Sequence, residues 1–195
     1  MLCNSPCPNK QRRLWLQSAG ATALGMALHA TGWANMHPAP LPASHPAVPG
    51  SVLAGGYLLR FFGLQVYDAR LWVQPNFDPT RLGQQPLVLE LKYLRGLKGR
   101  LIAERSLKEM RRHGNVNDAQ AERWLSEMTR LFPDVGANDK LTGILQPGLG
   151  AVFLFNDQPQ GQVADPEFAR LFFSIWLGSN TSEPAMRAAL LGERR

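Results

Sequence analysis

Arg60 is the residue of this 195-residue chain whose setting most suggests chemistry, because it interrupts an apolar run. It lies in GGYLLRFFGLQVYDARLWV, residues 55–73. A strand that buries one face normally excludes a charge, since an unpaired buried cation is costly. Arg60 must therefore face solvent, pair with an acid, or hold a ligand.

A tight turn at Gly63-Leu64 would place Arg60 beside a phenol. Glycine at the first central position is typical of a type II′ hairpin, and this turn would pair Arg60 with Tyr67. Directly opposed residues share one face of a sheet, and Asp68 and Arg70 make the other face the wetter one. We therefore expect Arg60 and Tyr67 to point inward, toward the helices.

An inward arginine beside a tyrosine hydroxyl would suit a carboxylate ligand. The guanidinium can bind both carboxylate oxygens and the phenol adds a donor, while apolar neighbours suit a hydrocarbon or aryl tail. Tyr93, on the core face of the strand expected over residues 86–97, could line the tail site, although a core tyrosine would give the same pattern. The alternative for Arg60 is a buried ion pair with an acid of the chain, such as Glu90 or Glu104.

Other kinds of site find little support in the sequence. The two cysteines, Cys3 and Cys7, precede the apolar N-terminal stretch, and His113 is the only histidine after residue 50. HExxH, P-loop and dinucleotide-binding glycine patterns are absent from the sequence. We therefore expect no metal and no cofactor, and we assign no catalytic residue.

The net charge of +6 does not indicate a nucleic-acid partner. Three basic residues and no acids lie in the first 34 residues, which leaves 18 basic against 15 acidic residues for the rest of the chain. Binding to phosphates needs a more concentrated basic face. The basic stretch over residues 95–112 is interpreted as a solvated helix face, with loose attraction to anionic lipid headgroups as the alternative.

The N-terminus is typical of an export signal. Arg12-Arg13 precede an apolar stretch over residues 14–28, which resembles a twin-arginine signal, and small residues follow at 32–34. We expect cleavage after about Ala34 and a periplasmic location; the alternative is an uncleaved signal that anchors the chain to the inner membrane. Residues 35–50 contain five prolines and predict an extended linker.

The periodicity after residue 50 predicts an α+β domain over residues 51–195. Strand patterns cover residues 56–62, 64–73, 86–97 and 161–165, a hairpin is expected around Pro147-Gly148, and helical patterns cover 99–114, 117–133, 165–178 and 181–192. Hairpins imply antiparallel pairing, and helices with one apolar stripe must cover a sheet. We expect an antiparallel sheet with helices layered mainly on one face.

Three stretches carry a resemblance to a known family. The run from Gly55 to Trp72, with Arg60, Val66-Tyr67 and Ala69, resembles the opening hairpin of the chalcone isomerase family. LELKYLRGLKGRLIAE (89–104) and ADPEFARLFFSIWLG (164–178) resemble its bacterial chalcone isomerase-like branch. The resemblance covers roughly residues 53–191 and implies an open-faced β-sandwich.

The resemblance also implies a function. Plant chalcone isomerases close a flavanone ring without a cofactor, using an arginine on the first strand and a threonine on the second. Arg60 matches that arginine, but Tyr67 stands in place of the threonine, which resembles the fatty-acid-binding members of the fold. The leading hypothesis is an exported, non-catalytic binder of a small apolar carboxylate such as a fatty acid. A cofactor-independent intramolecular lyase of the chalcone isomerase type and a structural envelope protein are the alternatives.

Overall fold

The computed structural model describes residues 44–193. The expected export signal and most of the expected linker lie outside these residues. The strands are β1 (Val52–Phe61), β2 (Leu64–Val73), β3 (Leu87–Tyr93), β4 (Lys140–Gln146), β5 (Gly150–Phe155) and β6 (Gln158–Val163). The helices are α1 (Gly99–Met110), α2 (Asp118–Leu131), α3 (Pro166–Leu177) and α4 (Pro184–Leu190), with a short 3-10 turn at Pro79–Arg81.

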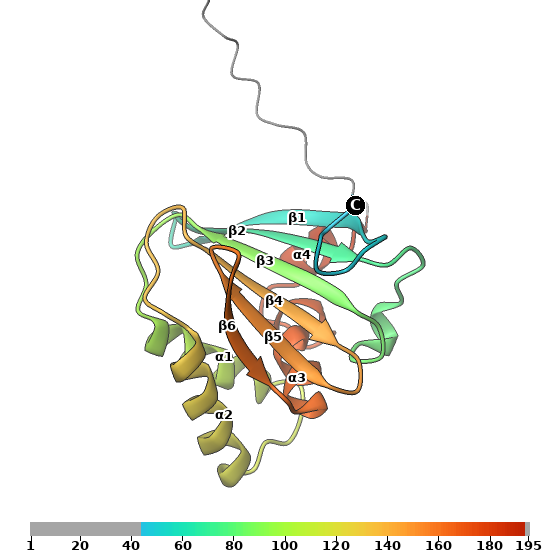
Figure 1. Cartoon of the computed structure of the whole chain (residues 1–195). Coiled ribbons are helices and arrows are strands. Elements are labelled where there is room, and N and C mark those ends of the chain that lie inside the picture. Colours follow the sequence, from blue (N-terminus) through green and yellow to red (C-terminus); the bar gives the residue numbers. More distant parts are fainter. Residues whose placement is uncertain (1–43, 194–195) are drawn as a thin grey trace, which may run out of the picture. The chain divides into compact units, whose positions relative to one another are not determined.

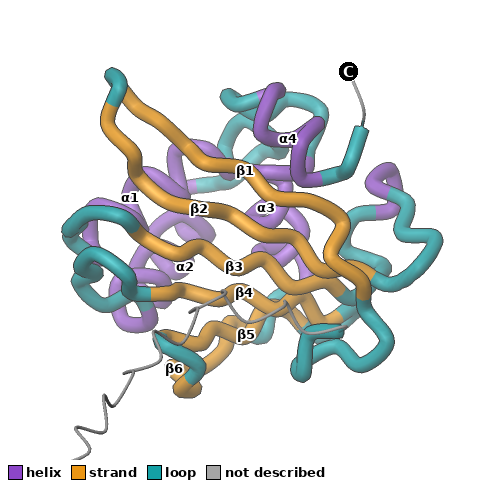
Figure 2. The backbone as a smooth tube through the Cα atoms, turned by 90° about the horizontal axis from the view of Figure 1, so that it is seen from above, coloured by secondary structure: helices purple, strands orange, loops and turns teal. Residues whose placement is uncertain are grey.

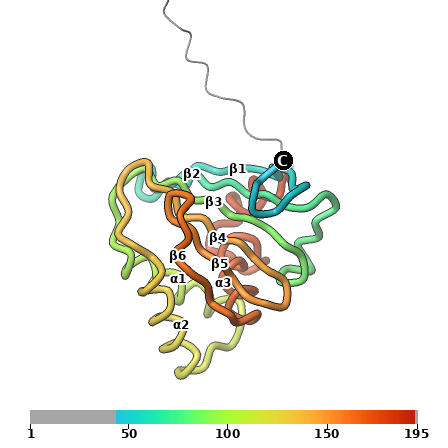
Figure 3. The backbone as a smooth tube through the Cα atoms, viewed as in Figure 1, coloured from blue at the N-terminus to red at the C-terminus, as the bar shows by residue number. Residues whose placement is uncertain are grey.

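The six strands form one antiparallel sheet in the order β1-β2-β3-β4-β5-β6, so each strand pairs with its neighbour in the sequence. Figures 1 and 2 show the four helices gathered on one face of this sheet, and Figure 3 follows the chain from β1 to α4. The predicted α+β class, with an open-faced sandwich of sheet and helices, is confirmed. The hairpin expected around Pro147-Gly148 is also present, between β4 and β5.

Alternation along the strands builds the core between sheet and helices. On β3, Leu87, Leu89, Leu91 and Tyr93 are all buried on the face that the helices cover. Asp165 caps α3, its Oδ1 accepting hydrogen bonds from the backbone N–H groups of residues 167 and 168. Burial of apolar side chains therefore holds the helices on the sheet, and the cap at Asp165 sets where α3 begins.

Helix α4 packs closely on β1 because Gly55 has no side chain. A Cβ atom at Gly55 would lie 2.0 Å from the carbonyl oxygen of Ala189 and 2.8 Å from that of Leu190. Such distances are far shorter than any van der Waals contact, so only glycine allows this approach. The glycine thus brings the last helix down onto the edge of the sheet.

The β1–β2 hairpin differs from its prediction by one residue. The turn is Phe62-Gly63, with φ of +47° and +78°, and Phe61 pairs with Leu64 and Arg60 with Gln65. A bulge between Leu59 and Arg60 then brings Leu59, not Arg60, opposite Tyr67. Shifting the pairing by one residue moves a side chain to the other face of the sheet. The expectation that Arg60 points inward is therefore wrong, whereas Tyr67 does lie on the core face.

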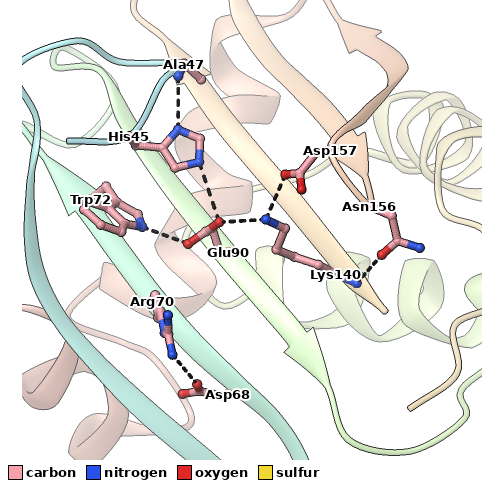
Figure 4. Close-up of polar contacts among 9 residues, drawn as sticks. All are labelled: His45, Ala47, Asp68, Arg70, Trp72, Glu90, Lys140, Asn156 and Asp157. Atoms are coloured by element: carbon pink, nitrogen blue, oxygen red, sulfur yellow. Dashed lines mark hydrogen bonds and ion pairs between the residues drawn. The ribbon is translucent and has the colours of Figure 1, made fainter. Parts of the chain in front are cut away.

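The end of the proline-rich segment packs on the open face of the sheet, where an extended linker was expected. His45 and Val48 are each 6 % exposed, and Val48 joins Trp72 and neighbouring apolar residues in a second, smaller cluster. Nε2 of His45 lies 3.6 Å from Oε1 of Glu90 (Figure 4). The folded part of the chain therefore begins at least six residues before the predicted boundary at residue 51.

Glu90 is the centre of a polar cluster on this open face (Figure 4). Its carboxylate accepts a 2.8 Å hydrogen bond from Trp72 Nε1 and a 3.2 Å bond from Lys140 Nζ. Burial by itself would raise the pKa of Glu90, but His45, Trp72 and Lys140 outweigh it and lower the pKa to about 2. The carboxylate of Glu90 is thus held by these three partners, and the ion pair considered between Glu90 and Arg60 does not form.

Candidate functional site: a cavity between the sheet and the helices

A cavity of about 350 Å³ lies between the first three strands and the helices. Its walls come from β1, β2 and β3 on one side and from α1, α3 and α4 on the other. Most of the lining is apolar, as Leu59, Leu91, Ile102, Phe172 and Ile175 illustrate. Ligand sites in proteins commonly have volumes of roughly 300–1,000 Å³, so this one is of a size to hold a small molecule.

Tyr67 supplies the best-positioned polar group of the lining. Trp176 Nε1 on α3 donates a 3.1 Å hydrogen bond to the Tyr67 hydroxyl oxygen, and Met186 Sδ on α4 lies 3.8 Å from the same oxygen. Burial raises the pKa of Tyr67 to about 12, although the bond from Trp176 opposes this. The phenol therefore stays protonated at neutral pH. The Met186 thioether is only a weak acceptor. The O–H group of Tyr67 can therefore donate instead to a better acceptor in the cavity.

Tyr93 lies directly beside Tyr67. The two residues are paired across β2 and β3, and their rings meet edge to face with centroids 5.8 Å apart. Tyr93 is 2 % exposed, and burial, reinforced by the neighbouring Tyr67, raises its pKa. Both tyrosines predicted as ligand contacts therefore line the same cavity.

Arg105 is the cation on α1 that lies near the two phenols. It lines the cavity, and its charge is close enough to act against the rise in the Tyr67 pKa. Its Nη2 lies 2.8 Å from Oε1 of Glu109, whose other oxygen lies 3.5 Å from Nε of Arg112. An arginine has five N–H donors in a planar fork, so the ion pair with Glu109 leaves donors of Arg105 for a ligand.

Arg60, the predicted anchor, does not line this cavity. Its side chain is on the solvent-facing side of β1 and is exposed, opposite Gln65. Arg95, which follows β3, and Arg105 are exposed as well, but both contribute to the cavity lining and therefore lie at its mouth. The cations available to a ligand are thus Arg105 and Arg95, and not the residue that the hairpin pattern indicated.

Several residues of the site were missed by the sequence reasoning. Trp176 and Met186 were assigned only to the helical patterns over residues 165–178 and 181–192, and Arg95 and Arg105 only to a solvated basic stretch. A signal for Arg105 did exist, because Leu101 and Arg105 are four apart and must share one side of a helix. No pattern in the sequence indicated that this side of the helix faces Tyr67, because the two segments are far apart in the sequence.

Two other properties of the described part of the chain bear on the site. Within residues 44–193, no three histidine, cysteine, aspartate or glutamate side chains are grouped as a metal site would need. Over the same residues, no helix has the length and apolar character to cross a membrane. Besides its apolar walls, tyrosines and arginines, the cavity is lined by two glutamates, Glu109 and Glu183, by two serines and by Trp176.

Comparisons with known proteins find one similar sequence and a similar fold. An uncharacterized protein of Haemophilus influenzae is 33 % identical to this chain over 112 residues. The matched residues make up 57 % of this chain and 54 % of that protein, so the chain spans about half the length of this relative. The crystal structure of a fatty-acid binding protein from Arabidopsis thaliana superposes with a TM-score of 0.61 at 16 % identity, covering 78 % of this chain and 91 % of that one. At that identity the likeness is one of fold.

A family model gives the more specific result. The model described as chalcone isomerase-like matches residues 53–192, which include all six strands and all four helices but for the first residue of β1. The resemblance seen in the hairpin, in residues 89–104 and in residues 164–178 is thereby confirmed. This chain belongs to the chalcone isomerase-like family.

Proposed function

We propose that this protein binds a small apolar carboxylate, such as a fatty acid, in the cavity and does not convert it chemically. The observation that carries the proposal is the Tyr67 hydroxyl. Its oxygen accepts a hydrogen bond from Trp176, and its proton has only the weak acceptor Met186 Sδ, so a stronger acceptor in the apolar cavity can take that proton's hydrogen bond. A carboxylate is the strongest acceptor that such a ligand could bring.

Arg105 supports the choice of an acid over a neutral ligand. Its guanidinium lines the cavity near Tyr67 and keeps donors beyond the one that faces Glu109. The carboxylate of Glu109 is already opposed by both Arg105 and Arg112, so it repels an incoming acid less than a lone glutamate would. The proposed ligand contacts are therefore Tyr67 and Arg105 at the head, with Tyr93 along the tail.

The apolar walls and the fold favour a hydrocarbon tail. The cavity lining from β1, β3 and α3 consists mainly of leucine, isoleucine and phenylalanine side chains. A chain of methylene groups transferred from water into such a site gains about 0.8 kcal/mol for each CH₂. The structural neighbour from Arabidopsis thaliana bears the name of a fatty-acid binding protein, which agrees with this choice.

Organic extraction of the purified protein tests the proposal. The full chain is purified from an envelope extract, its bound lipids are extracted, and mass spectrometry quantifies the acids per mole of protein. We expect an apolar acid in the wild type and in R60Q, whose side chain is outside the cavity. We expect little in Y67F and R105Q.

A calorimetric titration completes this experiment. Wild-type protein freed of lipid is titrated with decanoic acid, and R105K, which keeps the charge, is compared with R105Q. Absence of a co-purified acid together with absence of decanoate binding would refute the proposal. So would binding that R60Q abolishes and that Y67F and R105Q leave intact.

We further propose that the chain is exported, with cleavage after about Ala34. The support is the order of features in the sequence: Arg12-Arg13, the apolar stretch over residues 14–28, and small residues at 32–34. Fractionation of cells that express the full chain should find the protein in the periplasm, starting at Asn35, and R12K/R13K should retain it in the cytoplasm. A full-length membrane-bound product would contradict cleavage, and cytoplasmic wild-type protein would contradict export.

A further inference from the structure

The tip of the β1–β2 hairpin exposes three large apolar side chains. Phe61, Phe62 and Leu64 are 59 %, 90 % and 55 % exposed. The rings of Phe61 and Phe62 contact each other edge to face at 4.5 Å, which leaves most of their surface in water. Figure 2 shows this hairpin extending past the ends of the neighbouring strands. Such a patch needs an explanation beyond the packing of the domain.

The residue at the turn itself is an unusual choice. Phe62 has φ of +47° and Gly63 has φ of +78°, so both central residues are left-handed. Turns of this kind favour asparagine, aspartate or glycine, because a bulky side chain is strained there. Phe62 gains no burial in return for the strain, since it is 90 % exposed. A strained position that does not serve packing points to a role in recognition.

The same apolar surface continues into the mouth of the cavity. Phe61 lines the cavity although its side chain is exposed. Leu101, in the first turn of α1, is 53 % exposed and lines the cavity as well. The hairpin tip and the start of α1 therefore form the rim of one opening.

Basic residues surround this rim. Residues 59–66 and 94–102 contain Arg60, Arg95, Lys98 and Arg100 and no acid. Lys98 and Arg100 pair with Asp134 and Glu104, whereas neither Arg60 nor Arg95 has an ion-pair partner within the part of the chain that the structure describes. Exposed aromatic side chains beside unpaired arginines match an anionic lipid surface, since the rings enter the interface and the arginines bind phosphates.

We propose that this rim surface, made of Phe61, Phe62, Leu64 and Leu101 with Arg60 and Arg95, docks on an anionic lipid bilayer. Docking in this way would set the cavity mouth against the hydrocarbon, so that an apolar acid could pass between bilayer and cavity without crossing water; that last step rests on the proposed function. The docking itself concerns the protein with or without a bound acid.

Quenching by brominated lipid tests the docking locally. F62W in the full chain places an indole at the tip, and L149W places one at another exposed leucine, 66 % exposed in the β4–β5 turn. Both are mixed with vesicles of phosphatidylcholine and phosphatidylglycerol that contain dibrominated chains, and the wild-type emission is subtracted. We expect F62W to be quenched at least twofold more than L149W, and half-saturation to need about tenfold more lipid in vesicles without phosphatidylglycerol.

Loss-of-function variants complete the test. F62S/L64S, which changes only rim residues outside the cavity lining, should weaken vesicle binding relative to L149S while leaving decanoate binding unchanged. This separates a failure of docking from a failure of the ligand proposal. Equal quenching of F62W and L149W, or none, would overturn the docking. So would a dimer in the absence of lipid that F62S/L64S dissociates, because a second copy of the chain would then be the partner of the rim.

Discussion

The indole nitrogen of Trp176 donates a 3.1 Å hydrogen bond to the hydroxyl oxygen of Tyr67, and so joins helix α3 to strand β2 inside the cavity. This contact fixes the orientation of the phenol, because the oxygen is an acceptor for Trp176 and can donate only in another direction. The hydroxyl in turn donates a long hydrogen bond to the sulfur of Met186, 3.8 Å away. A ligand carboxylate would replace this weak acceptor with a strong one.

Replacing Tyr67 by phenylalanine should separate ligand binding from folding. Y67F keeps the ring and its contact with Tyr93 but removes the donor to the ligand. We expect decanoate affinity to fall roughly tenfold, which is about 1.4 kcal/mol. The free energy of unfolding should fall by about 1–3 kcal/mol because Trp176 Nε1 loses its acceptor. Titration calorimetry and urea unfolding measure the two effects; an unchanged affinity would exclude Tyr67 as a ligand contact.

The Glu90 cluster predicts a loss of stability in acid. Its pKa is lowered from 4.5 to about 2 in the folded state, so the folded protein binds fewer protons than the unfolded chain between these values. The stabilisation of the folded state by Glu90 is complete above about pH 4.5 and is lost as the pH falls toward 2. We expect it to amount to about 2 kcal/mol, because the Glu90 side chain keeps some contact with water, which weakens its charge interactions.

Urea unfolding at a series of pH values tests this prediction. E90Q should lose about 2 kcal/mol less stability than the wild type between pH 4.5 and 2. The pKa values of Asp78, Asp134, Asp139 and Asp165 are also lowered, so both proteins keep the acid dependence that comes from those groups. The control E104Q removes a carboxylate that is 41 % exposed in an i, i+4 pair with Arg100, and it should lose as much stability as the wild type. Identical pH profiles for the wild type and E90Q would contradict the role of the cluster.

Adding one methyl group at Gly55 should destabilise the fold. In G55A the new Cβ would lie 2.0 Å from the carbonyl oxygen of Ala189, so α4 must move away from β1. We expect a loss of about 3 kcal/mol or more in the free energy of unfolding. The neighbouring G56A, whose Cβ would meet its nearest atom at 3.2 Å, should lose less than half as much. Equal effects of the two substitutions in thermal unfolding would argue against this close packing.

A non-catalytic cavity should not accelerate the closure of a chalcone. With its pKa raised to about 12, the Tyr67 phenol stays protonated and cannot take a proton from a substrate hydroxyl at neutral pH. We therefore expect the absorbance of a 2′-hydroxychalcone to decay at the same rate with and without the protein. An acceleration that Y67F abolishes would show that the cavity is catalytic.

Most of the fold could be predicted from the sequence because its elements have clear periods. The alternation of Leu87, Leu89, Leu91 and Tyr93 marks one buried face of a strand, and Asp165 before a proline marks the start of α3. Sequential hairpins leave few ways to order the strands. Residues 44–50 were predicted less well, because the packing of His45 and Val48 depends on partners elsewhere in the chain.

The orientation of Arg60 could not be predicted in the same way. It depends on the turn falling at Phe62-Gly63, one residue earlier than expected, and on a bulge beside Leu59. Each is a change of one residue in the backbone geometry, and the hydrophobic pattern of the sequence fits the hairpin with or without it. The pattern alone therefore does not show which face of the sheet Arg60 takes. Tyr67 was placed correctly because β2 continues without interruption into the core.

The most direct test of the binding site is a carbon NMR spectrum of decanoic acid labelled at the carboxyl carbon. With lipid-free protein in excess, we expect one bound carboxyl signal for the wild type and for R60Q. Its chemical shift should stay constant over the pH range in which free decanoic acid titrates. The signal should be lost or strongly displaced in Y67F/R105Q. No bound signal for the wild type, or a signal that R60Q removes and Y67F/R105Q retains, would contradict binding of the carboxylate at Tyr67 and Arg105.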